Sequence, residues 1–241
     1  MRLPPSLGPR DAHVWRVSLG VSDELAQRLE GLLSPDERAR SQRFGAARRR
    51  EFVVGRGALR LILGTYLAAS PAALRLRADT GGKPALAPGP WSGQLRFNLS
   101  HTADLLLVAV ARGREVGIDV ERVKPARASS QIVKQLFPAR EQELLRSLPR
   151  DRRTRAFFTC WTRKEAYLKG TGAGMSVALE KIDVLPAPAL PAPWVVYDLP
   201  VGPGHAAALA AEGAVSRILL IPLRAAALGR LTSVSPCFAE P

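Results

Sequence analysis

The stretch Gly117-Ile118-Asp119-Val120-Glu121 places two carboxylates two residues apart at the end of an apolar run. Alternate side chains of a β-strand point to opposite faces, so Asp119 and Glu121 share one face and the branched apolar side chains share the other. Two carboxylates on a rigid strand are oxygen ligands that a hard divalent cation such as Mg2+ uses beside substrate phosphates. A half-buried strand with a solvated polar face shows the same alternation, so the pair alone does not decide between them.

A second acidic residue lies in a predicted helix farther along the chain. Residues 157–169 read Phe-Phe-Thr-Cys-Trp-Thr-Arg-Lys-Glu-Ala-Tyr-Leu-Lys, and Gly170 follows as a residue suited to the C-terminal cap. Phe158, Trp161, Glu165 and Leu168 have the spacing of one helical stripe. Glu165 therefore interrupts the core-facing side, where an unpaired carboxylate costs several kcal/mol or is driven to protonate.

Lys169 lies four residues after Glu165, and two interpretations of this pair stay open. An ordinary helix-surface ion pair contributes roughly 0.2–0.5 kcal/mol but leaves the neighbouring aromatic stripe unexplained. A metal ion held by Asp119, Glu121 and Glu165, with Lys169 close to a phosphate, accounts for all four charges. The spacing alone does not show that the strand and the helix meet.

Five ordered motifs resemble the 4'-phosphopantetheinyl transferase superfamily, in particular its monomeric, surfactin-synthetase-activating type. The similarity covers about Leu33 to Met175, and each motif by itself is common. The matching segments are Gly117 to Glu121, Trp161 to Lys169, Phe97-Asn98-Leu99-Ser100-His101-Thr102, Gly82-Lys83-Pro84, and Ser34-Pro35 through Arg43-Phe44 with Gly55-Arg56. One departure is Glu37, where relatives often carry a basic residue near the 3'-phosphate of coenzyme A; Arg38 and Arg40 are alternative sources of that charge.

The resemblance implies an α+β fold of two pseudo-duplicated subdomains, each a small antiparallel sheet packed with helices. We expect residues 1–113 to form the N-terminal subdomain with the coenzyme A contacts. Residues 114–241 would form the C-terminal subdomain with the metal site and the catalytic helix. Both halves lie in one chain, so a monomer should suffice, with the coenzyme between the halves.

The resemblance also implies the reaction and the role of each site residue. The family moves 4'-phosphopantetheine from coenzyme A to a serine of an apo acyl or peptidyl carrier protein and releases adenosine 3',5'-bisphosphate. Carrier proteins of fatty acid, polyketide or nonribosomal peptide synthases are the expected partners. The implied roles are Glu165 as base, Asp119, Glu121 and Glu165 as ligands of Mg2+ (or Mn2+), Lys169 on a phosphate, Lys83, Ser100 and His101 on the 3'-phosphate and its neighbours, and Arg50 or Arg56 as a further clamp.

The composition fits a globular protein that binds anions. Hydrophobic residues make up 46% of the 241, and 35 basic against 21 acidic residues give a formal charge of +14. Such an excess attracts coenzyme A, an acidic protein or nucleic acid alike, but no reading helix or stacking platform for nucleic acid is recognisable. No apolar run is long enough for a bilayer, and the start lacks a signal-peptide core, so we expect a cytoplasmic protein.

Two other functions remain open on the residues alone. Another Mg2+-dependent phosphoryl-transfer enzyme could also use three acids and a lysine. A non-catalytic basic protein that binds a carrier protein or nucleic acid would show the same charge excess. Only turnover that depends on an apo carrier protein separates the transferase from both.

The periodicity also predicts the order of the elements. Ser100 and His101 should lie on a turn, and Gly113 should close a hairpin that delivers Asp119. The alanine-rich stretch 205–211 favours a helix by propensity, whereas the family implies a strand, which we adopt. Strands are expected at 14–19, 95–98, 105–111, 115–121, 194–199 and 217–223, helices at 22–33, 35–44, 47–68, 129–137, 139–148 and 153–169, a loop at 81–93 and a Pro-rich connection at 186–193.

Overall fold

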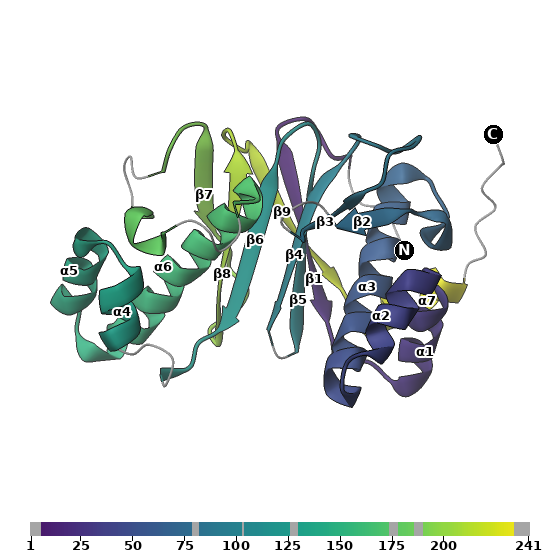
Figure 1. The fold of residues 1–241 in the computed structure, drawn as a ribbon, viewed down its shortest axis with the longest axis horizontal. Coiled ribbons are helices and arrows are strands. Elements are labelled where there is room, and N and C mark those ends of the chain that lie inside the picture. Colours follow the sequence, from purple (N-terminus) through teal and green to yellow (C-terminus); the bar gives the residue numbers. More distant parts are fainter. Residues whose placement is uncertain are drawn as a thin grey trace.

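The computed structural model describes residues 6–78, 82–102, 104–125, 130–173, 178–185 and 190–233. Figure 1 shows two sheets side by side at the centre, with α1, α2, α3 and α7 flanking one and α4, α5 and α6 flanking the other. The Pro-rich segment 186–189, Gly174 and Met175 lie outside the described residues. None of the described helices is long and apolar enough to cross a bilayer.

The first sheet has the strand order β4-β5-β1-β9. Its strands are β1 (Asp11–Ser18), β4 (Arg96–Thr102), β5 (Leu105–Ala111) and β9 (Arg217–Leu223). β5 pairs antiparallel with β4 and β1, whereas β9 runs parallel to β1. A separate two-stranded antiparallel sheet pairs β2 (Leu76–Ala78) with β3 (Pro84–Leu86), and β3 lies inside the segment 81–93 predicted to be loop.

The second sheet is antiparallel and has the order β6-β8-β7. It comprises β6 (Val116–Arg122), β7 (Trp194–Asp198) and β8 (His205–Glu212). The alanine-rich β8 is a strand, as predicted, because every residue from Ala206 to Ala211 is buried between neighbouring strands and a helix that needs small side chains. Tertiary context here overrides helix propensity.

The first six helices agree with the predicted ones to within a few residues at each end, whereas α7 is not among the predicted helices. α1 (Asp23–Gly31) begins at the Ser22 cap, and α2 (Pro35–Gln42) begins at a capping box made by Ser34 and Glu37. These caps satisfy backbone N–H groups of the first turns. The others are α3 (Ala46–Leu67), α4 (Ser130–Leu136), α5 (Ala139–Ser147), α6 (Arg150–Thr171) and α7 (Ala225–Ser233), with single 3-10 turns η1 (Pro71–Ala73) and η4 (Leu179–Lys181).

β5 separates the two halves of the core because its side chains alternate. Leu106, Val108 and Val110 pack with the helices α1 and α3 in one cluster. Leu105 and Leu107 pack instead with the apolar face of β6 and with β8 in a second cluster. The two sheets therefore share a buried interior, in which the apolar side of the Gly117 to Glu121 stretch lies as its alternation predicts.

Three local predictions are wrong. β5 and β6 do not form a hairpin: Gly113 turns the chain with φ 65°, but β6 then leaves for the second sheet and pairs with β8. Ser100 and His101 lie within β4 rather than on a turn, because the ladder with β5 continues to Thr102. α6 runs past Gly170 to Thr171, and its C-cap is Gly172, whose φ of 69° is the left-handed conformation that glycine favours.

The α+β class with small sheets packed by helices is confirmed. The division of the chain at residue 113 remains a prediction. The C-terminal segment returns to pack with elements of the first half. β9 joins β1 of the first sheet, and α7 contacts α1 and α3. A boundary drawn in space would therefore place residues 217–233 with the first half.

Candidate active site

α6 and β6 approach each other backbone to backbone, and this contact positions the acidic residues. A β-carbon on Gly117 would lie 2.7 Å from the Gly170 Cα and closer still to the Ala166 carbonyl oxygen, and one on Gly170 would lie 2.5 Å from the Trp194 ring. Only glycine permits such an approach. The contact brings Asp119, two residues along β6, beside Glu165 and Lys169 of α6.

Asp119 is the centre of a buried polar network. It is 3% exposed, and its Oδ1 accepts hydrogen bonds from Ser100 Oγ at 2.8 Å and from Lys169 Nζ at 2.6 Å. The Lys169 ammonium also lies 3.1 Å from Ser100 Oγ. β4, β6 and α6 thus each contribute one member, so the strand and the helix meet as the sequence left open.

Asp119 Oδ2 is buried and has no hydrogen-bond partner among the described residues. A buried carboxylate oxygen without a partner carries a large desolvation cost, which a cation would relieve. The atom is thus suited to ligate a metal ion. Within the described residues, however, no three acidic, histidine or cysteine side chains lie close enough together to form a ready metal site.

Glu165 is half-buried, and burial raises the pKa of its carboxyl group. The charge of Asp119 raises this pKa further, while Lys169 lowers it. A carboxylate whose proton affinity is raised in this way is better suited to accept a proton near neutral pH. This environment is the one expected for an acid on the core-facing stripe of its helix.

A pocket of about 720 Å³ opens beside this network. Glu165 and Lys169 lie in its wall with Trp161, all from α6. Lys83, Asn98 and Leu99 from the first half line it as well, so both halves of the chain contribute. Its volume is in the range of small-molecule and cofactor sites, which often lie where two units of a fold meet.

Lys83 reaches the pocket from the segment before β3. Its Nζ lies 3.0 Å from Glu115 Oε2 and 2.9 Å from the Val116 carbonyl oxygen, so the ammonium is fixed at the start of β6. Lys83 and Lys169 therefore place two positive charges on the wall of one pocket. Such a pair can bind a ligand with more than one phosphate.

Arg50, Arg56, His101 and Glu121 are not among the residues that line this pocket. Arg50 bonds Asp23 and the Val21 carbonyl, and Arg56 lies 3.6 Å from Glu37 and against the Phe52 ring. His101 is half exposed and lies 3.8 Å from Glu51 on α3. Glu121 occupies the same face of β6 as Asp119, one register step from the strand end opposite Ala206.

Asn98 is a site residue for which the sequence suggested no role. Its Oδ1 accepts a 2.8 Å hydrogen bond from the Ile118 N–H, and Ser100 Oγ accepts a 3.4 Å hydrogen bond from the Val120 N–H. β4 and β6 belong to different sheets, so these side chains replace the main-chain ladder between them. Polar residues two apart in a buried strand were the available signal.

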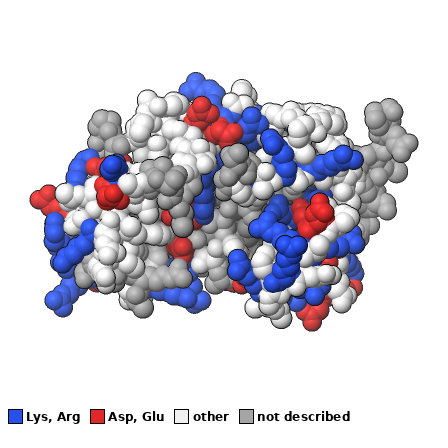
Figure 2. All heavy atoms as spheres, viewed as in Figure 1, with Lys and Arg blue, Asp and Glu red and all other residues white. Residues whose placement is uncertain are grey.

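Basic side chains dominate both helical flanks of the face drawn in Figure 2, with fewer acidic ones among them. On the α2–α3 flank, Arg40 and Arg56 lie over the Phe52 ring, and Arg48 lies over Phe44. Stacking places these guanidinium groups against aromatic faces and leaves their charge unchanged, although Arg56 is also paired with Glu37. The formal charge of +14 is thus displayed over a broad surface, where it attracts anions generally.

Comparison with known proteins shows which family this chain resembles. Residues 115–195 match the family model of the 4'-phosphopantetheinyl transferase superfamily. The chain is 40% identical over 219 residues to the 4'-phosphopantetheinyl transferase HetI of Nostoc sp., covering 87% of this chain and 92% of that protein. It is 27% identical to the Bacillus subtilis transferase Sfp, over 68% of this chain and 71% of Sfp.

The similarity to a human relative covers a smaller share of that protein. The chain is 30% identical to the human L-aminoadipate-semialdehyde dehydrogenase-phosphopantetheinyl transferase, over 70% of this chain and 59% of that protein. The matched region of the family model contains β6 and α6, the two elements that carry Asp119, Glu165 and Lys169. With the similarity to HetI extending over nearly the whole of both chains, this protein belongs to the 4'-phosphopantetheinyl transferase superfamily.

Proposed function

We propose that the pocket lined by β4 and α6 is where this chain transfers 4'-phosphopantetheine from coenzyme A to a serine hydroxyl of an apo carrier protein, releasing adenosine 3',5'-bisphosphate. Membership of the superfamily makes the chain a transferase of this kind. The observation that carries the location is the contact of Asp119, Ser100 and Lys169 beside Glu165 in the pocket wall.

Glu165 is the proposed general base. A serine hydroxyl is a poor nucleophile at neutral pH and must lose its proton as it attacks phosphorus. The carboxyl group of Glu165 lines the pocket, and its raised pKa increases its affinity for that proton. The carrier serine would enter the pocket from the solvent and place its hydroxyl hydrogen on a Glu165 oxygen.

Lys169 and Lys83 are the proposed phosphate-binding residues. Both ammonium groups line the pocket, one from α6 and one from the segment before β3. Coenzyme A carries a pyrophosphate and a 3'-phosphate, and charge-assisted hydrogen bonds would hold them. Lys169 would then stabilise charge that builds up on the leaving phosphate during in-line displacement. Ser100 and Asn98 keep the strand geometry on which these contacts depend.

Asp119, Glu121 and Glu165 are the proposed ligands of Mg2+, which Mn2+ could replace. The support is that the buried Asp119 Oδ2 has no hydrogen-bond partner among the described residues, and that Glu165 lies close enough for the Asp119 charge to raise its pKa. Hard oxygen donors of this kind suit Mg2+. When bound, the ion would neutralise charge on the pyrophosphate. The ligand set of the ion, and the binding of coenzyme A phosphates by Ser100, His101, Arg50 and Arg56, remain predictions.

The remaining expectations concern the setting of the reaction. One chain supplies both walls of the pocket, which supports action as a monomer. The carrier proteins would come from polyketide, nonribosomal peptide or fatty acid synthases, in the cytoplasm, without a nucleic acid or membrane partner. The basic flanks would attract an acidic carrier protein over a long range.

Intact-protein mass spectrometry tests the proposal. An apo carrier protein is incubated with this chain, coenzyme A and Mg2+, beside an EDTA control and a carrier whose target serine is alanine. We expect a metal-dependent gain of one phosphopantetheine on the parent carrier only. The Glu165→Gln variant should bind coenzyme A yet lose transfer. Transfer by that variant at the parental rate would exclude Glu165 as the base, and no transfer to any of several carriers would count against the function.

A further inference from the structure

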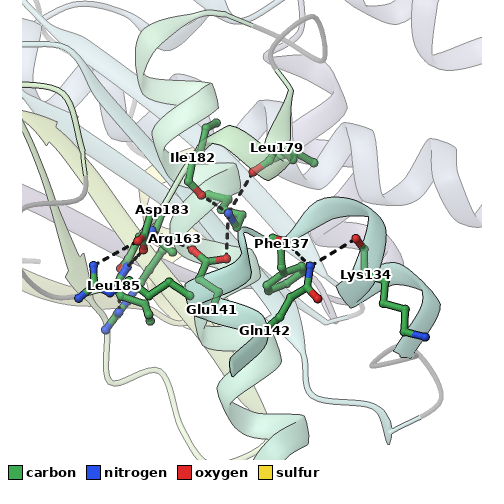
Figure 3. Close-up of polar contacts among 12 residues, drawn as sticks. Lys134, Phe137, Glu141, Gln142, Arg163, Leu179, Ile182, Asp183 and Leu185 are labelled. Carbon is green, nitrogen blue, oxygen red and sulfur yellow. Dashed lines mark hydrogen bonds and ion pairs between the residues drawn. The ribbon is translucent and has the colours of Figure 1, made fainter. Parts of the chain in front are cut away.

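Lys164, the residue before Glu165, is fully buried in an ion pair. Its Nζ lies 2.9 Å from Glu141 Oε2, and both side chains have no exposed surface. The Phe137 ring lies 5.4 Å from the ammonium. Figure 3 shows Glu141 on α5 facing the backbone of Leu179 and Ile182, and the Lys164 ammonium contacts all three residues. Because it lies in the interior, this lysine does not reach a phosphate in the pocket.

The Lys164 ammonium also holds a segment of backbone that follows α6. It donates hydrogen bonds to the carbonyl oxygens of Leu179, at 3.1 Å, and of Ile182. Glu141 holds the same segment a little farther along, since its Oε1 accepts a 2.9 Å hydrogen bond from the Val184 N–H. The ion pair therefore fastens residues 179–184 to α5 and α6 at three backbone positions.

This fastened segment is part of the pocket described above. Ala178, Leu179 and Glu180 line the pocket together with Glu165. One turn of α6 thus carries Glu165 in the pocket wall and, next to it, the lysine that holds an adjoining wall in place. A buried ion pair is a weak source of stability, because apolar side chains of similar volume often serve as well. Apolar side chains could not, however, hold the two carbonyl groups.

We propose that Lys164 is a positioning residue, which fixes the segment that carries the pocket-lining residues Ala178, Leu179 and Glu180 relative to Glu165 and so sets the affinity of the pocket for coenzyme A. The proposal rests on the proposed function for its ligand. The contact that matters is the one from the lysine to the carbonyl oxygens of Leu179 and Ile182, and Glu141 keeps the buried ammonium neutralised.

Two variants separate the lysine contacts from the ion pair. Lys164→Met removes both carbonyl contacts and the charge. Glu141→Gln removes the charge of the partner but leaves an amide of the same shape, beside which a buried lysine can lose its proton and still donate two hydrogen bonds. We expect the dissociation constant of coenzyme A, measured by calorimetry, to rise about tenfold in Lys164→Met and less than about threefold in Glu141→Gln.

Hydrogen exchange gives a readout that does not need coenzyme A. Amides of residues 179–184 should exchange faster in Lys164→Met than in the parent, and much less so in Glu141→Gln, while amides of β1 stay unchanged. The KM for coenzyme A should rise in parallel with the dissociation constant, with a smaller change in kcat. If the parent chain transfers no phosphopantetheine, the proposed function is wrong. The comparison of hydrogen exchange between the parent and Lys164→Met would still test the role of Lys164.

The double variant Lys164→Met with Glu141→Leu tests whether weak binding in Lys164→Met is due only to loss of the fold. It replaces both buried charges by apolar side chains, so it removes the unpaired Glu141 carboxylate that Lys164→Met leaves behind, but it does not restore the carbonyl contacts. We expect this variant to melt at a higher temperature than Lys164→Met yet bind coenzyme A as weakly. Parental binding and parental exchange at 179–184 in the folded double variant would overturn the proposal, as would equal effects of the two single variants.

Discussion

Gly117 of β6 and Gly170 of α6 form a backbone contact that a single methyl group would break. A β-carbon on Gly117 would stand 2.7 Å from the Gly170 Cα, and one on Gly170 would stand 3.2 Å from the Gly117 nitrogen. Both glycines belong to the two segments that carry the acidic residues. The close contact gives a physical reason for glycine at both positions, because the side chains of Asp119 and Lys169 can pair only when β6 and α6 lie this close.

Gly117→Ala should therefore disturb the whole site. The added methyl group meets backbone atoms of α6, which cannot rotate away, so we expect a loss of about 3 kcal/mol or more in the free energy of unfolding. Urea unfolding followed by circular dichroism measures it. Gly31→Ala is the matched control, because nothing lies within 4 Å of a β-carbon at the end of α1. Equal stabilities of the two variants would contradict the close contact.

Asn98→Ala tests the side-chain link between the two sheets. The change leaves the buried Ile118 N–H without its acceptor, which should cost about 1–3 kcal/mol. The amide of Ile118 should also exchange faster than in the parent, as nuclear magnetic resonance can follow. Gln94→Ala removes an exposed hydrogen bond to the Pro90 carbonyl and should change neither quantity by much. Unchanged protection of Ile118 in Asn98→Ala would argue that water or another group replaces the amide.

The sequence predicts the bounds of the strands better than it predicts which strands pair. The strands at 105–111 and 217–223 have the predicted bounds, because alternation and apolar runs are local signals. The assignment of β6 to a different sheet from β5, and of β9 to the first sheet, depends on contacts between distant residues. A tight turn at Gly113 looks the same in both topologies, so the predicted hairpin had no local signal against it.

In the site, too, local periodicity predicts the positions of residues within an element, but not the contacts between residues that are distant in the sequence. The positions of Asp119, Glu165 and Lys169 follow from strand and helix periodicity, once the two elements are known to touch. The role of Lys164 could not be read in this way, because its partner Glu141 lies on another helix and nothing in the spacing links the two. Arg50 shows the reverse case: a basic residue in the expected segment bonds Asp23 on α1 instead of lining the pocket.

The partners of Glu37 give this residue a structural role in the first half of the chain. Its Oε2 lies 2.7 Å from Arg60 Nε, and Arg60 is 1% exposed and also donates to the carbonyl oxygens of Pro71 and Leu74. Glu37 is thus a structural residue that neutralises a buried guanidinium and caps α2. A basic residue at this position would place a second positive charge beside Arg60.

Glu37→Ala should consequently destabilise the N-terminal half. Removal of the carboxylate leaves the Arg60 charge buried without its partner, and we expect a loss of about 3–5 kcal/mol. Glu24→Ala, which breaks the exposed pair of Glu24 with Arg28 on α1, should cost less than about 0.5 kcal/mol. Thermal unfolding of both variants gives the comparison. Similar melting temperatures would show that Arg60 finds another partner.

Cys160 should be inert toward thiol reagents in the folded protein. The thiol lies buried on α6, and burial together with the charge of Glu141 raises its pKa to about 12. The reactive thiolate at pH 8 is then about a thousandfold scarcer than for an ordinary thiol. A Cys237→Ser background, which removes the one cysteine outside the described residues, isolates its reaction with Ellman's reagent.

The same raised pKa fixes the sign of a pH effect on stability. The unfolded thiol ionises near pH 8.5, roughly, whereas the native thiol stays protonated, so unfolding releases a proton above that pH. The native state binds the proton more tightly, and its stability should therefore fall as pH rises from 8 to 10. Cys160→Ala should show a shallower fall in the urea midpoint over this range. Labelling of Cys160 in the native parent at the rate of the urea-unfolded chain would contradict its burial.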